Sequence, residues 1–126
     1  MDAMTRLDQT ATETLVRWLA WRLDVNAPRV LHNRRRIWAG YSVGRAAILL
    51  GVCPTRVKTV VHEFAHHLDV ARNGKEATAG RRSHSRSFYH CLRLVIAATG
   101  CVADYPWKSE YRQLQQWHEW TQNSAR

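Results

Sequence analysis

Cysteine and long apolar runs are scarce in this sequence, and each shortage excludes a class of protein. The three cysteines, Cys53, Cys91 and Cys101, are an odd number without close spacing, so they predict neither a disulfide framework nor a zinc ribbon. The longest apolar stretch, residues 46–53, is far too short to span a bilayer. Residues 1–10 lack the apolar core of a signal peptide. We therefore expect an intracellular, cytoplasmic protein with no membrane segment.

Acidic residues are also scarce, because 10 Asp and Glu stand against 19 Lys and Arg and leave a net charge of +9. A charge this high favours an acidic partner, above all nucleic acid, although solubility alone is the simpler interpretation. Part of the charge is concentrated in the run Arg34, Arg35 and Arg36. We interpret this run as a solvated turn in preference to a specific phosphate site.

Apolar side chains, by contrast, are plentiful and have helical spacing. The chain has 126 residues, of which 45% are hydrophobic, so it can bury a core as a single domain over residues 1–126. A leucine at every fourth position from Leu15 to Leu23 predicts a helix. We expect this helix to begin at a capping box near Thr10 and to end before Asn26.

Short apolar runs and helix-ending residues fill the rest of the chain. Residues 29–50 hold short runs separated by asparagine and glycine, which predict two or three antiparallel strands. Pro54 is expected to open a second helix, and Gly74 to end it. A third helix is predicted over about residues 85–98, ended by Gly100, and a last, aromatic-rich helix over about residues 107–121. The expected fold class is α+β: an N-terminal helix, a small antiparallel sheet, the second helix and two further helices.

One motif in the second predicted helix indicates chemistry. Residues 62–66 read His-Glu-Phe-Ala-His, which is the H-E-x-x-H pattern of zinc metallopeptidases. His62 and His66 are four residues apart on one helix face, so both rings can reach one ion. Glu63 lies about 100° around the helix, where its carboxylate can reach a metal-bound water without binding the metal. A pair of surface histidines is the simpler interpretation, which the largely apolar helix disfavours.

A catalytic zinc also needs a third protein ligand and an open position for water. The metzincin pattern would place that ligand at residue 72, but Arg72 cannot bind zinc. His84 precedes Phe88 by four residues and so continues the apolar face of the third predicted helix. We favour His84 as the third ligand over the alternatives Glu76 and His90.

Other polar side chains near the motif have weaker signals. His67 points about 100° away from His66. Asp69 shares the face of His62 and His66 and could orient one of their rings, although we favour the interpretation of a plain surface carboxylate. An oxyanion stabiliser is expected, and the sequence does not identify it. Four tyrosines are candidates: Tyr41, Tyr89, Tyr105 and Tyr111.

Two segments together resemble a known family. Residues 62–68, a loop, and then His84-Ser85-Arg86-Ser87-Phe88 are similar to the SprT-like zinc metallopeptidases, which include the Spartan proteases that degrade proteins crosslinked to DNA. The family pattern is H-E-x-x-H followed by a loop, a histidine, usually a glycine, and a phenylalanine four residues after the histidine. The resemblance covers roughly residues 37–96. Ser85 stands where glycine is usual, and the cysteine-rich zinc ribbon of many members is absent from this sequence.

The resemblance implies a zincin-like fold and a zinc metalloendopeptidase with protein or peptide substrates. It also implies that the substrate lies along an edge strand, here residues 45–51, and that DNA contacts a basic surface. Zinc would lower the pKa of its water to about 7, and Glu63 would take that water's proton and pass it to the leaving amine. The alternative is a non-catalytic nucleic-acid-binding module whose zinc is structural. Its fourth ligand would have to be His90, Glu76 or Cys91.

Overall fold

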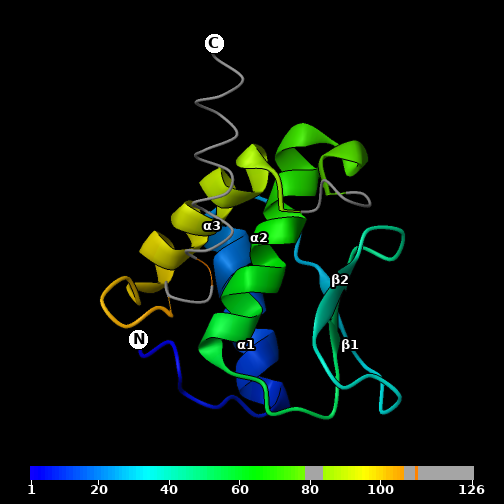
Figure 1. Ribbon diagram of the computed structural model, residues 1–126, viewed down its shortest axis with the longest axis vertical. Coiled ribbons are helices and arrows are strands. Elements are labelled where there is room, and N and C mark those ends of the chain that lie inside the picture. Colours follow the sequence, from blue (N-terminus) through cyan, green and yellow to red (C-terminus); the bar gives the residue numbers. More distant parts are fainter. Residues whose placement is uncertain (79–83, 107–109, 111–126) are drawn as a thin grey trace.

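The computed structural model of the chain describes residues 1–78, 84–106 and 110, and it has the α+β architecture expected from the sequence. The elements follow one another as α1 (Gln9–Arg22), β1 (Arg29–His32), β2 (Gly40–Ser42), β3 (Ala47–Leu50), α2 (Val57–Asn73), the 3-10 helix η1 (Lys75–Thr78) and α3 (Arg86–Thr99). Helix α2 runs through the centre, with the sheet on one side and α3 on the other (Figure 1). The helix predicted over residues 107–121 lies outside the described residues, apart from Glu110.

Helix α1 forms where the leucine spacing predicts it, but its cap is Asp8 rather than Thr10. Asp8 Oδ1 accepts a hydrogen bond from Ala11 N at 2.8 Å, which satisfies one of the free N–H groups at the helix start. Leu15 and Leu19 are buried in the core, as the apolar stripe requires. The spacing of apolar residues therefore located the helix without identifying its first cap.

The sheet is mixed, so the prediction of a purely antiparallel sheet is wrong. The strand order is β1-β3-β2, in which β1 pairs parallel with β3 and β2 pairs antiparallel with β3. Three of the four residues of β3 are buried: Ala47, Ile48 and Leu50. The segment over residues 45–51 is therefore the middle of the sheet and not its edge, which corrects the expected position of the substrate strand.

A close backbone approach at Gly51 fixes the segment that leads into β2. Val52 N donates a hydrogen bond to Arg36 O at 2.9 Å, and the next residue makes an equivalent bond to Ile37 O. A Cβ atom on residue 51 would lie 2.6 Å from Ile37 O, so this approach requires glycine. The chain between β1 and β2 is thereby held against the residues that lead into α2.

Helix α2 begins at Val57, so the predicted start at Pro54 is wrong. The reason is a contact with the N-terminal segment. Leu7 N donates to Thr55 O at 2.9 Å, and Val57 N donates to Thr5 O at 3.0 Å. These bonds keep the residues after Pro54 extended, and the helix begins only at Val57.

The ends of α2 and α3 agree with the prediction. Gly74 follows α2 with a φ of 88°, and Gly100 follows α3 with a φ of 74°, which are values that glycine adopts without steric cost. Ser85 caps α3 by accepting a hydrogen bond from Phe88 N at 3.5 Å. No helix among the described residues is long and apolar enough to cross a membrane.

Candidate metal centre

Three histidines from two parts of the chain converge on one point. His62 and His66 lie one turn apart on α2, and His84 lies just before α3. One ring nitrogen of each lies within 4.8 Å of a nitrogen of the other two. The Nε2 atoms of His62 and His84 are 3.2 Å apart. Two nitrogens that share a tetrahedral zinc are separated by about 3.3 Å, so the group could hold one metal ion.

The described residues provide this group with three side chains and no more. Glu76 and His90, the alternatives for the third position, are exposed and do not belong to the group. No other histidine, cysteine, aspartate or glutamate among residues 1–78, 84–106 and 110 joins it. Three protein ligands with an open side are typical of catalytic zinc, whereas structural zinc usually has four.

Phe88 packs against all three imidazoles. Its ring centroid lies 5.1 Å from that of His62, 4.2 Å from that of His66 and 4.9 Å from that of His84. Burial, with the charges of His62 and His84, lowers the pKa of His66 to about 3. Burial also lowers the pKa of His84. Both rings are therefore neutral at physiological pH, which is the form that binds a metal.

Glu63 lies beside the histidines and is only 8% exposed. It lines a pocket of about 290 Å³ together with all three histidines, the first residues of the edge strand β2 and the residue before that strand. Burial raises the pKa of the Glu63 carboxyl, and the nearby positive charges of His62 and Arg36 only partly oppose this rise. A carboxylate with a raised pKa has the basicity that a general base needs near neutral pH.

Glu110, which no sequence motif indicated, forms a hydrogen bond with the first histidine of the group. His62 Nδ1 donates to Glu110 Oε1 at 2.7 Å, and Tyr105 OH donates to the same oxygen at 2.9 Å. Burial tends to lower the pKa of His62, but the bond to Glu110 and the charge of Glu63 outweigh burial and raise it. Burial tends to raise the pKa of Glu110, but the same two hydrogen bonds lower it. The one signal in the sequence was that Glu110 is the only acidic residue over positions 105–118.

His67 turns away from the group, as predicted, and has a different role. Its Nε2 donates to Asn26 O at 2.6 Å, so its Nδ1 accepts the hydrogen bond from Tyr41 OH at 2.7 Å. The hydroxyl proton of Tyr41 is therefore engaged with His67, and that of Tyr105 is engaged with Glu110. In this arrangement neither hydroxyl proton is available to stabilise an oxyanion. Tyr89 is buried, and Tyr111 lies outside the described residues.

Asp69 is completely buried, so its interpretation as a surface carboxylate is wrong. Its Oδ1 accepts a hydrogen bond from Asn73 Nδ2 at 2.8 Å, one turn further along α2. Its Oδ2 has no hydrogen-bond partner among the described residues. Burial is the main cause that raises the pKa of the Cys91 thiol to about 11, and the nearby charge of Asp69 is the second cause. Asp69 therefore faces α3, and we find no bond between it and a histidine of the group.

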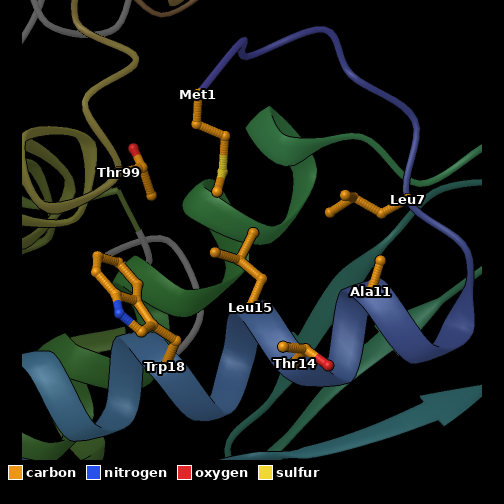
Figure 2. Close-up of a pocket in the computed structure, with 7 residues that line it drawn as sticks. All are labelled: Met1, Leu7, Ala11, Thr14, Leu15, Trp18 and Thr99. Carbon is orange, nitrogen blue, oxygen red and sulfur yellow. The ribbon is translucent and has the colours of Figure 1, made fainter.

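A second hollow, between α1, the N-terminal segment and the end of α3, has no comparable chemistry. It encloses about 420 Å³. Its lining consists of Met1, Leu7, Ala11, Thr14, Leu15, Trp18 and Thr99 (Figure 2). None of these residues has an acidic or basic side chain, and none lines the pocket of the three histidines. Of these two hollows, the one at the histidine group is the one lined by titratable side chains.

Fold and site together define an α+β protein with a three-histidine group that could hold a metal ion, in an arrangement consistent with a zincin-like H-E-x-x-H site. The chain matches no model of a known protein family, no curated protein sequence and no solved structure. Any more specific assignment therefore depends on the geometry of the site and on the residues that carry it.

Proposed function

We propose that this protein is a zinc metallopeptidase in which His62, His66 and His84 hold the metal and Glu63 is the general base. The observation that carries the proposal is the convergence of three imidazole nitrogens in the pocket that the buried Glu63 also lines. Three neutral imidazoles suit zinc, and three protein ligands leave a coordination position open. The motif resemblance to the SprT-like peptidases supports the same function.

In the proposed hydrolysis, the metal ion and the side chains have separate roles. When bound, the ion would polarise the carbonyl of the substrate and acidify the attacking water. Glu63 would accept the proton of that water on its carboxylate and return it to the leaving amine. Its raised pKa favours the first of these transfers, because it makes the carboxylate a stronger base. Phe88 would shield the sides of the rings that it contacts from bulk water, which strengthens the charge interactions there.

The proposed substrate is an extended peptide that pairs with β2. This strand is an edge of the sheet and its first residues line the histidine pocket. A smaller pocket, of about 220 Å³, adjoins the histidine pocket at His62 and Glu63. Its lining also includes Trp38, Lys58 and Pro106. A peptide added to a sheet edge is held mainly by its backbone, so we propose weak sequence preference.

Metal content of the purified protein tests the proposed ligands. We expect about one zinc per chain in the wild type, loss of that zinc in His84→Ala, and its retention in His90→Ala. The two substitutions are matched, because both remove an exposed histidine near the start of α3. Mass spectrometry for metals on all three proteins gives the answer. A wild type that binds no metal even when zinc is supplied would reject the proposal.

We further propose that the basic surface binds DNA. Arg34 and Arg35 are exposed in a turn, in agreement with the predicted solvated turn, and they carry part of the net charge of +9. Phosphate contacts make affinity fall steeply with salt, by roughly 10³-fold or more between 50 and 200 mM for six or more contacts. Fluorescence anisotropy with labelled DNA should show this fall, and Arg34→Ala with Arg35→Ala should flatten the salt dependence. Affinity that is insensitive to salt contradicts the proposal.

A further inference from the structure

Glu110 and Tyr105 form a short hydrogen-bond chain that ends on a histidine of the metal group. Tyr105 is buried in the core, and Glu110 is 9% exposed. One oxygen of the Glu110 carboxylate accepts both the Tyr105 hydroxyl, at 2.9 Å, and His62 Nδ1, at 2.7 Å. The segment that carries Tyr105 is itself anchored, because Ala3 N donates to Asp104 Oδ2 at 2.9 Å. The carboxylate therefore has a defined position relative to α2.

This contact determines which nitrogen of His62 is available to a metal. A carboxylate only accepts hydrogen bonds, so the ring proton of His62 must be on Nδ1. In the neutral ring, which is the form that binds a metal, the lone pair is then on Nε2, the atom that lies 3.2 Å from His84 Nε2. The two ring nitrogens are on different sides of the imidazole, so Glu110 cannot be a fourth ligand of the same ion in this arrangement.

From this geometry, and resting on the proposed metal site, we propose that Glu110 is the positioning residue for His62. Tyr105 holds the carboxylate, and the carboxylate fixes the tautomer and orientation of the ring. A carboxylate behind a metal-binding imidazole also makes the ring a more basic ligand. Tyr105 and Glu110, which follow α3, are therefore functional parts of the site, although neither is a direct ligand.

Coupling of this kind acts in both directions. If Glu110 strengthens zinc binding at His62 Nε2, zinc strengthens the hydrogen bond from Nδ1 to Glu110 by the same free energy. Zinc should therefore slow hydrogen exchange of the His62 Nδ1 proton. This proton gives a spectroscopic signal that reports on the contact itself and not on the overall stability of the fold.

Zinc affinity, measured by competition with a chromophoric chelator, tests the role. We expect Glu110→Ala to weaken zinc binding about 10- to 100-fold. Glu110→Gln keeps the shape and one acceptor oxygen but loses the charge, so its loss should be smaller, and it serves if the alanine variant does not fold. Glu13→Gln, a change at a half-buried glutamate of α1 outside the histidine group, is the matched control and should bind zinc as the wild type does.

Nuclear magnetic resonance of the zinc-loaded proteins completes the test. The wild type should show a slowly exchanging His62 Nδ1 proton, and Glu110→Ala should show fast exchange at this position. Equal zinc affinity and equal exchange in wild type and both Glu110 variants would overturn the positioning role alone, because the three histidines would still bind zinc. Failure of the wild type to bind zinc would overturn this role together with the proposed function.

Discussion

Glu63→Gln is expected to abolish peptide hydrolysis and to leave the metal bound. The glutamine amide has almost the same shape as the carboxylate but cannot accept a proton at neutral pH, and all three histidines stay in place. Loss of a general base typically costs about 10²- to 10⁴-fold in rate. Turnover of an unfolded, fluorescently labelled protein, measured beside zinc content, separates loss of chemistry from loss of metal.

The control for Glu63 is Glu76→Gln, which makes the same chemical change at an exposed glutamate of η1 outside the histidine group. This variant should hydrolyse the substrate at the wild-type rate. If Glu63→Gln and Glu76→Gln turn over equally well, Glu63 is not the base. If the wild type binds zinc and hydrolyses no protein or peptide, the alternative of a nucleic-acid-binding module with a structural zinc becomes the better interpretation.

Phe88→Ala is expected to destabilise the metal-free protein by about 3 to 5 kcal/mol, which is the usual cost of removing a fully buried phenylalanine. Phe88 is fully buried between α2 and α3 and contacts His62, His66 and His84. Loss of the Phe88 ring would leave a cavity directly behind the three histidines. Urea denaturation of the metal-free protein, with chelator present, measures the effect without any contribution from zinc.

Two further variants make the Phe88 prediction specific. Phe88→Leu keeps most of the apolar volume and should cost clearly less than the alanine variant. Leu94→Ala removes an apolar side chain from the same helix at a position that is 41% exposed, and it should change stability by no more than about 0.5 kcal/mol. If Phe88→Ala costs no more than Leu94→Ala, the packing of Phe88 against the histidines is not a source of stability.

Local patterns in the sequence predicted the parts of the structure that depend on neighbouring residues. Helical spacing located α1, α2 and α3, and the glycines at 74 and 100 marked where the last two end. The same spacing argument selected His84 over His90 and Glu76, because His84 continues the buried face that Phe88 begins. The structure brings His62, His66 and His84 together; their roles as zinc ligands, and that of Glu63 as a base, remain predictions.

Contacts between distant parts of the chain were the ones that the sequence did not predict. The strand order β1-β3-β2 depends on pairing across the sheet, which short apolar runs do not encode. The start of α2 depends on pairing with residues 5–7. Glu110 is 48 positions from His62 along the chain, and no spacing rule connects them. The sequence argument placed Asp69 on the surface because a carboxylate is rarely fully buried. Its complete burial results from packing against α3, which the sequence does not reveal.

The contacts of His67 limit how the walls of the histidine pocket can move. This single ring joins Tyr41 on β2 to Asn26 in the turn after α1, from its own position next to His66 on α2. The edge strand and the helix that carries the histidines should therefore move as one rigid body, with little hinge motion between them.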